Sequence, residues 1–355
     1  MVPFIILLLA PIMVQHTYIK ELDRQKKNKM AILVFFALYT VLVMLRHESV
    51  GVDTRNYIFY FNRFSRLDWS ELKNISFEFG FTYFNRIVSI FTNDYQIFFA
   101  VTAIVIVAMI YLVYKRSCTD PSLSIVLFCI MPTFVMMFSG IRQMLAVGLG
   151  FLAYELTRNK KIVTFILVVC LSITFHTSAF MLFFMYPLYH AKITKKWSYV
   201  AVPVLFVTFV FNKQIFSVLG SFLEKYTKYD TSIAQTGAYT MLLLFVMFAV
   251  FAFVIPDESR LDQETIGLRN FLLFSVAIQM FAPLHTLAMR MNYYYIIFIP
   301  LLLPKIIEYR SERWKQIAVA SRHIMVAFFL VYFFVNAKSG GSLNVFPYHF
   351  YWEEI

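Results

Sequence analysis

Long apolar runs separated by short polar segments dominate the chain. A helix that crosses a bilayer needs roughly 20 predominantly apolar residues, because the hydrocarbon core is about 30 Å thick and the backbone polar groups must be satisfied inside it. Such runs lie near residues 2–19, 30–45, 95–114, 121–138, 142–157, 162–175, 177–190, 198–211, 238–255, 270–287, 291–304 and 317–335. They predict an all-α polytopic transmembrane helical bundle of about 10–12 spans.

The uncertainty in the number of spans comes from short runs. The segments on either side of His176 are compatible with two spans joined by a turn or with one bent, broken helix. Composition supports a membrane protein, because 60% of residues are hydrophobic and 15% charged, whereas soluble domains carry about 25% charged residues. The whole chain, 1–355, is therefore expected to form a single integral membrane domain.

The distribution of basic residues predicts the orientation in the membrane. If the N-terminus lies outside, 20 of the 32 Lys and Arg residues fall on the cytoplasmic side, mostly in short loops, as the positive-inside rule requires. These residues are Lys20, Arg24, Lys26, Lys27, Lys29, Lys115, Arg116, Arg158, Lys160, Lys161, Lys192, Lys195, Lys196, Arg260, Arg269, Lys305, Arg310, Arg313, Lys315 and Arg322. The net charge of +12 is thus explained by anionic lipid, and no nucleic acid partner is expected.

Three polar segments are placed outside by this topology. Residues 46–94 mix aromatic rings with Arg and Asp, which is typical of helices lying at the membrane interface. The others are 212–237 and the C-terminal tail 336–355, in which Gly340 ends the last helix. The three cysteines contain no CxxC pair, so we expect neither a disulfide framework nor a zinc site.

Ionisable residues at the ends of apolar spans are costly, and each is a candidate for function. Asp53 and Arg55 follow the second span, where a solvated loop with a helix N-cap is the simpler interpretation. Arg142 follows Ser139 and Gly140 and has no acidic neighbour in the sequence. A snorkelling Arg is one explanation. The other is an anion site, in which the free N–H groups of a helix start join a guanidinium that binds phosphate bidentately.

Two histidines complete the candidates. His176, beside Thr177 and Ser178, is either a hydrogen-bonded structural residue, a general base or a group that orients a phosphate. His285 and Arg290 lie at a predicted outer turn, followed by tyrosines typical of the aromatic belt. All these places fall on the outer side, and we expect Asp53, Arg142, His176 and Arg290 to line one cavity.

Taken in order, these residues resemble a known family. The motifs are Gly51-x-Asp53-Thr-Arg55-Asn-Tyr57, Glu78-x-Gly80-Phe81, Ser139-Gly-Ile-Arg142-Gln143-x-Leu-Ala146, His176-Thr-Ser-Ala and Arg290-x-x-x-Tyr294. Their order and spacing over nearly the whole chain are similar to the EpsG-type branch of Wzy-like polysaccharide polymerases. The resemblance implies a GT-C-like glycosyltransferase with an outer-face cavity in the bacterial plasma membrane. The topology that the basic residues predict places both termini on the extracytoplasmic side.

The resemblance also implies a substrate and partners. The enzyme would transfer a polyprenyl-pyrophosphate-linked glycan onto another lipid-linked repeat unit, as in O-antigen, capsule or exopolysaccharide synthesis, with a chain-length regulator and a flippase as protein partners. No DxD or HExxH pattern calls for a metal, so metal-independent transfer without a cofactor is expected. The alternatives are a flippase of the same lipid-linked saccharide and a membrane acyltransferase. A flippase would have ionisable residues spread through the depth of the bilayer, and an acyltransferase would have its site at the inner side.

Roles follow from the chemistry of glycosyl transfer. Cations stabilise the diphosphate leaving group, and Arg142 and Arg290 are the choices. His176 is the first choice for the base, with Asp53 and Glu78 behind it, because an Asp that holds Arg55 is the weaker base. The expected substrate-binding residues are Arg142, Arg290, Arg55, Gln143, Tyr57, Tyr294 and His285. Aromatic rings in 57–84 and 346–352 would stack on sugars.

Overall fold

The described residues of the chain are helical and form no β-sheet. The computed structural model describes residues 1–17, 23–221, 235–340 and 343–354, in which the only extended pairings are two isolated β-bridges. The chain divides into two compact units: unit 1 consists of Met1–Leu182 with Arg322–Ile355, and unit 2 of Phe183–Ser321. The expectation of an all-α fold is confirmed, and each unit is described by itself below.

Helices long and apolar enough to cross a membrane occur in both units. Among the residues that the structure describes, four helices are long and apolar enough, Arg24–Met44, Tyr95–Ser117, Gly237–Val254 and Glu312–Lys338. The number rises to as many as seven when each bent pair of helices counts as one span. Shorter apolar helices are α1 (Val2–His16) and α9 (Ile162–Phe175). The chain is thus a multi-pass membrane protein, and the number of 10–12 spans stays a prediction.

Unit 1 is built from paired helices. Besides α1 and α9 it contains α2 (Arg24–Met44), α5 (Tyr95–Ser117), α6 (Pro121–Ile130), α7 (Pro132–Ser139), α8 (Ile141–Arg158) and the C-terminal part of α17 (Lys315–Lys338). Buried rings fill the space between α2 and α7, where the Tyr39 hydroxyl donates to the carbonyl of Phe134 at 2.6 Å. Asp120 caps α6 and pairs with Arg322, which joins α17 to this helix.

The predicted span 121–138 is wrong as a single helix, and the predicted spans 177–190, 270–287 and 291–304 are likewise each divided between two helices. The run 121–138 forms α6 and α7, which meet at 60° around Met131. The cause is Pro132, since a proline has no N–H to donate and disfavours the helical conformation of the preceding residue. Accordingly, Met131 has an extended backbone (φ −71°, ψ 141°).

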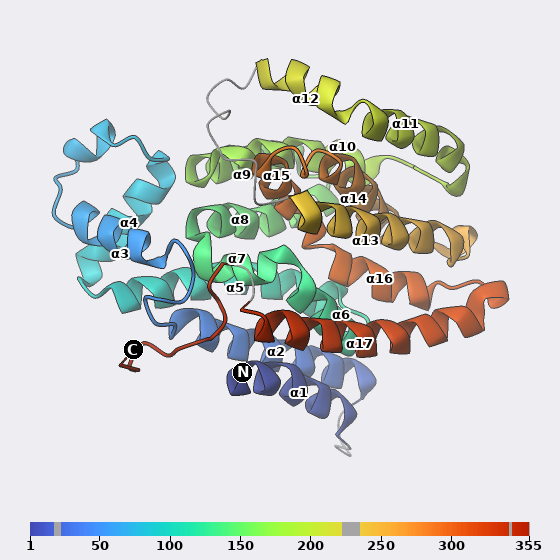
Figure 1. Ribbon diagram of the computed structural model, residues 1–355, viewed down its shortest axis with the longest axis horizontal. Helices are drawn as coiled ribbons and strands as arrows, with labels where there is room; N and C mark the ends of the chain where they lie inside the picture. Colours follow the sequence, from blue (N-terminus) through green and yellow to red (C-terminus); the bar gives the residue numbers. More distant parts are fainter. Residues whose placement is uncertain (18–22, 222–234, 341–342, 355) are drawn as a thin grey trace. The chain divides into compact units, whose positions relative to one another are not determined.

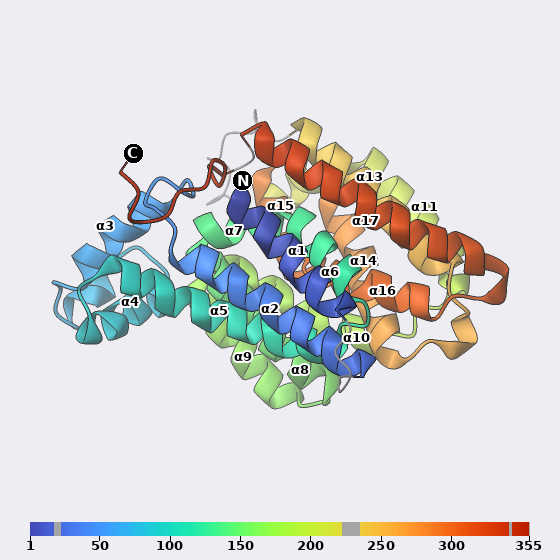
Figure 2. The same cartoon turned by 90° about the horizontal axis from the view of Figure 1, so that it is seen from below.

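The segment 46–94, which the sequence predicts to lie outside, forms short helices, as its pattern predicted. They are α3 (Thr54–Phe64), η1 (Glu71–Asn74) and α4 (Phe79–Phe91). In Figures 1 and 2, α3 and α4 lie beyond the ends of α2 and α5. Helix α3 is amphipathic and buries one face, with Phe61 stacked on Phe98 of α5 at a centroid distance of 4.7 Å. These contacts hold the segment on the bundle of unit 1.

The C-terminal tail closes against the chain that enters α3. Helix α17 ends at Lys338, and Gly340 follows with a φ of +92°, a conformation that favours glycine. The tail then pairs with the α2–α3 loop, since the N–H groups of Gly51 and Val52 donate to the carbonyls of Asn344 and Leu343 at 3.1 Å. The tail therefore supports the loop that carries the first motif.

Unit 2 contains the remaining helices. They are α10 (Met185–His190), η3 (Lys195–Trp197), α11 (Ser198–Val210), α12 (Asn212–Ser221), α13 (Gln235–Val254), η5 (Glu258–Arg260), α14 (Gln263–Gln279), α15 (Thr286–Ile296), α16 (Ile299–Glu308) and η6 (Glu312–Trp314), while η2 (Thr177–Phe184) spans the boundary between the units. Helices α15 and α16 form a pair bent by 47°. Most of the second outer segment, 222–234, lies outside the described residues.

Two basic residues expected in cytoplasmic loops are buried inside unit 2. Arg269 of α14 is fully buried, and its two terminal nitrogens donate to the carboxylate of Glu258 at 2.7 and 2.8 Å. Lys305 of α16 is 8% exposed and pairs with Glu264 at 3.2 Å. They are structural ion pairs, so these two charges do not belong in a count of loop charges, and the orientation of the chain stays a prediction.

Candidate functional site

The first motif packs against the start of α8. Helix α8 begins at Ile141, directly after Gly140, as the sequence predicted. Gly51 has a φ of +92°, and a Cβ at this position would lie 2.1 Å from the carbonyl oxygen of Phe138. Thr54 donates its hydroxyl to the same carbonyl at 3.2 Å. Only glycine allows this close approach, and it brings the Asp53 loop onto the break between α7 and α8.

Arg142 is paired with an acid, which corrects the expectation that it lacks an acidic neighbour. Its Nη1 lies 2.5 Å from Oε2 of Glu78, and its guanidinium lies 4.7 Å from the centre of the Phe77 ring. Glu78 is 64 residues away in the sequence and is brought in at the N-terminus of α4. Because the Arg142 side chain is still 29% exposed, this charge-assisted pair stands at a surface that a ligand can reach.

Tyr57 also contacts Arg142 at this site. Its phenol is hydrogen-bonded to the side chain and to the main chain of Arg142, and its ring packs edge-on against Phe81 at 5.7 Å. Burial raises the pKa of Tyr57 and outweighs the opposing effect of Arg142, so the phenol is neutral near pH 7. Tyr57 and Glu78 therefore occupy one side of the predicted anion site at the start of α8, and the Arg142 guanidinium stays partly exposed beside them.

Asp53 and Arg55 do not form the pair that the sequence suggested. Arg55 is 71% exposed and contacts Glu48 at 3.3 Å. Asp53 instead faces Ser139: its N–H donates to the Ser139 hydroxyl at 3.3 Å, and the hydroxyl reaches its carboxylate at 3.5 Å. The expectation that Asp53 holds Arg55 is wrong, because Asp53 precedes α3 as its N-cap, whereas Arg55 lies inside the helix and contacts Glu48.

His176 stands at the sharp turn after α9, with an extended backbone. Its Nδ1 accepts the Ser178 N–H at 3.3 Å and lies 2.7 Å from the Ser178 hydroxyl. A ring nitrogen that accepts a main-chain N–H carries no proton, so in the neutral imidazole the proton is on Nε2. The side chain is half-buried and presents an N–H donor, which suits a group that orients a phosphate or hydroxyl.

Helix α4 connects the Arg142 site to the His176 turn. A Cβ on Gly80 would lie 2.2 Å from the Thr174 hydroxyl, so the start of α4 touches the end of α9. Phe84 and Phe175 meet edge-on at 6.1 Å one turn further along. Unit 1 therefore gathers four of the five sequence motifs around one helix. At the contact between α4 and α9, Glu78 lies two residues before Gly80 and His176 lies two residues after Thr174.

Sequence reasoning missed Arg46, which lies between α2 and α3. It is 1% exposed, its Nη1 donates to the carbonyl of Val43 at 2.6 Å, and its guanidinium lies over Phe99 at 4.1 Å. Its Nε and Nη2 find no hydrogen-bond partner among the described residues. Burial lowers the pKa of Arg46 to about 10, so it stays charged at neutral pH, and its field reaches Tyr57. The sequence feature that could have identified Arg46 as a candidate is its position directly after an apolar run.

The other predicted substrate residues lie in different surroundings. Gln143 is buried in α8. In unit 2, His285 is the N-cap of α15 and accepts the Leu287 N–H at 3.0 Å, Arg290 is half-buried on α15, and Tyr294 is 1% exposed. Tyr294 is thus an interior residue, which corrects its assignment to an aromatic belt. That Asp53, Arg142, His176 and Arg290 line one cavity stays a prediction.

Exposed aromatic rings stand near the Arg142 site. Trp69 is 43% and Phe79 62% exposed, and both contact Tyr83 at centroid distances of 5.9 Å. Phe79 directly follows Glu78 in the chain. Such rings offer apolar faces with little conformational freedom to lose, as required for stacking on a sugar. Among the described residues, no group of three His, Cys, Asp or Glu side chains is placed to hold a metal ion.

Comparison with known families decides the affiliation. The model of the EpsG family matches residues 29–350, which include all five motifs and every element of the site described above. The chain belongs to the EpsG family. Its members are associated with polymerase activity of a glycosyltransferase kind, so this is a membrane enzyme of the polysaccharide polymerase type. No curated protein and no solved structure matches the chain significantly.

Proposed function

We propose that this chain polymerises polysaccharide at the outer face of the bacterial plasma membrane, by transferring a polyprenyl-pyrophosphate-linked glycan onto a second lipid-linked repeat unit. The observation that carries the proposal is the Arg142 cluster. A part-exposed guanidinium is held by Glu78, Tyr57 and Phe77 at the start of a helix, within the region matched by the family.

The cluster suits a diphosphate leaving group. Glu78 binds one nitrogen of Arg142, and Phe77 supports its plane, so the guanidinium is oriented before substrate binds. As the bond between the anomeric carbon and the phosphate oxygen breaks, the diphosphate takes the electron pair, and a fixed cation stabilises that charge without reorganising. Arg46 adds a second, buried positive charge behind Tyr57.

Asp53 is the proposed base. The acceptor hydroxyl attacks the anomeric carbon and gives its proton to a carboxylate, and Glu78 is less available because it is bound to Arg142. Asp53 is half-buried, interacts with Ser139 and is not paired with Arg55. His176, whose Nδ1 is occupied, donates Nε2–H to the diphosphate or to the acceptor hydroxyl. The rings of Trp69 and Phe79 receive the acceptor sugar.

The test uses the full-length protein in liposomes supplied with lipid-linked repeat units. Chain growth, seen as a ladder of lipid-linked oligomers, is the expected result, and Arg142→Ala should abolish the ladder. A matched control is Arg55→Ala, which removes an exposed cation paired with Glu48. Movement of the lipid-linked unit across the bilayer without chain growth would identify a flippase and overturn the proposal.

A further inference from the structure

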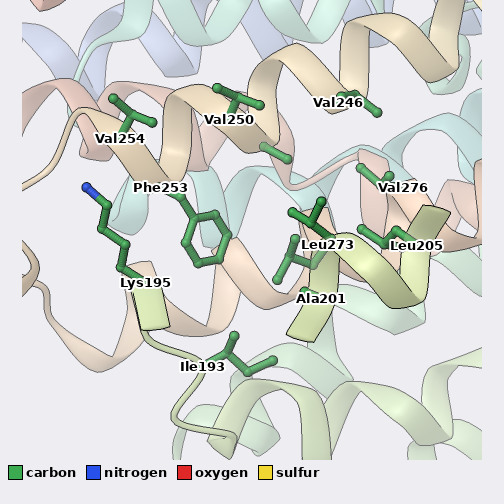
Figure 3. Close-up of a pocket in the computed structure, with 12 residues that line it drawn as sticks. Ile193, Lys195, Ala201, Leu205, Val246, Val250, Phe253, Val254, Leu273 and Val276 are labelled. Carbon is green, nitrogen blue, oxygen red and sulfur yellow. The ribbon is translucent and has the colours of Figure 1, made fainter. Parts of the chain in front are cut away.

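Unit 2 contains an apolar groove between α11, α13 and α14 (Figure 3). Its cavity volume is about 230 Å³, and its walls are Ala201, Val202 and Leu205 of α11, Val246, Ala249, Val250, Phe253 and Val254 of α13, and Leu273 and Val276 of α14. Ile193 and Lys195 close one end. The groove opens to the surface of the unit, because Val202 is 64% and Val250 58% exposed.

The size and lining of the groove suit a hydrocarbon chain. An engineered apolar cavity of about 150 Å³ stays dry and binds benzene, so this larger groove accommodates a longer apolar segment. All its walls are aliphatic or aromatic apart from Lys195. Helix α13 is long and apolar enough to cross a membrane, and in such a helix the residues that line the groove would face lipid chains.

The polar end of the groove is basic. Lys195 lies there beside Val254 and Phe253 in Figure 3, and Lys192 and Lys196 are exposed on the same loop. Glu258 accepts hydrogen bonds from both terminal nitrogens of buried Arg269 and from the main-chain N–H of Lys195. Its charge is therefore neutralised by Arg269, and the loop keeps a net positive charge.

We propose that this groove binds an anionic phospholipid, with one acyl chain between α11 and α13 and the phosphate at Lys195. The predicted topology places residues 191–197 on the cytoplasmic side, where the leaflet is anionic and each basic residue attracts it. The pyrophosphate of a glycan donor would lie on the opposite side, which favours a phospholipid over the polyprenyl carrier. The site is separate from the Arg142 cluster and does not depend on the proposed activity.

The experiment reconstitutes the full chain in nanodiscs of phosphatidylglycerol and phosphatidylcholine in equal amounts and identifies retained lipid by native mass spectrometry. Phosphatidylglycerol should be retained about fivefold over phosphatidylcholine, as expected for one cation at the headgroup. Lys195→Gln should bring the ratio close to one. Lys213→Gln, an exposed lysine of α12 outside the groove, is the matched control and should leave the ratio unchanged.

A second pair of variants tests the acyl chain. Ala249→Trp fills the groove and should remove the retained lipid, whereas Met247→Trp, at a position of the same helix that is 60% exposed and does not line the groove, should not. Thermal unfolding checks that each variant is folded, and Ala201→Leu is a smaller obstruction from α11. Equal retention of the two lipids, retention unaffected by Ala249→Trp in a folded protein, or displacement by polyprenyl phosphate at equal mole fraction would each overturn the proposal.

Discussion

Three histidines of this protein share one local geometry, and it decides what their rings can do. The Nδ1 atoms of His47, His176 and His285 accept the N–H of the residue two positions later, at 3.2, 3.3 and 3.0 Å. Each ring therefore satisfies a backbone donor at a turn or helix start that would otherwise lack a partner. In all three the neutral ring carries its proton on Nε2, which makes it a donor towards its surroundings.

Because the Nδ1 atom of His176 accepts a backbone hydrogen bond, Asp53 and His176 are expected to have different roles, as base and as hydrogen-bond donor. Asp53→Asn should lower single-turnover transfer at least about a hundredfold with donor affinity nearly unchanged, because a general base acts in the transition state. His176→Ala should weaken donor binding about tenfold by removing one hydrogen bond to a charged group. Donor binding and single-turnover transfer are measured on the same purified variants. If His176→Ala binds donor normally but transfers nothing, the histidine is the base.

Arg142 makes contacts that lysine cannot reproduce. Its guanidinium bonds Glu78 and Tyr57 while lying over Phe77, and a lysine ammonium is a point charge on a flexible stem. Arg142→Lys should fold normally and lose at least about tenfold in chain growth, since one hydrogen bond to a charged group is worth 1.5–3 kcal/mol. Arg55→Lys is the control. Equal activity of the two variants would mean that Arg142 supplies only surface charge.

The sequence pointed to individual candidate residues but not to the residues that they contact. Arg142 was recognisable because a glycine and a serine precede it at the end of an apolar run. Its pairing with Glu78 was not, since the two are separated by 64 positions and no local pattern encodes a contact of that kind. The same limit explains Asp53 and Arg55: they are near in sequence, yet each has a different partner in space.

Among the elements, prolines and glycines determine where the apolar runs break or touch. Pro132 converts one predicted span into α6 and α7, a break that the sequence carried and that counting apolar residues overlooked. The glycines of the motifs act differently. Gly51 and Gly80 allow backbone and side-chain atoms of other elements to approach within distances that a Cβ would forbid. These contacts depend on tertiary packing, so the local sequence pattern does not predict them.

The close packing of Gly51 against the end of α7 leads to a testable prediction. Gly51→Ala introduces a Cβ that would meet the Phe138 carbonyl at 2.1 Å and strains a backbone with φ +92°. We expect the loop to move off α8, so that chain growth falls at least about tenfold and the midpoint of thermal unfolding drops. Gly237→Ala of α13, where a Cβ meets nothing within 4 Å, should be neutral or slightly stabilising. Unchanged activity in Gly51→Ala would show that the loop position does not matter.

For the molecule as a whole, the hydropathy pattern predicted the helical class and the position of most of the long apolar helices, because a membrane imposes length and composition on each span. It placed several of the helix breaks wrongly, as in the run 291–304, which is divided between α15 and α16. It did not predict the division into two compact units, since that depends on which helices pack together. Four of the five motifs belong to unit 1, and the fifth, with Arg290 and Tyr294, belongs to unit 2. The fifth motif therefore raises the question of whether both units contribute to one donor site.

A double-mutant cycle answers that question. If Arg142 and Arg290 bind the same diphosphate, Arg142→Lys and Arg290→Lys should each weaken donor affinity. The affinity of the double variant should then differ by about twofold or more from the value expected if the two losses were independent, because groups that share a ligand are coupled. Arg55→Lys combined with Arg290→Lys provides the uncoupled reference, since Arg55 pairs with Glu48 at the surface. Donor affinity is measured by equilibrium binding of a lipid-linked repeat unit to each purified variant. Strictly additive losses, or an unchanged affinity in Arg290→Lys, would place Arg290 outside the donor site and confine that site to unit 1.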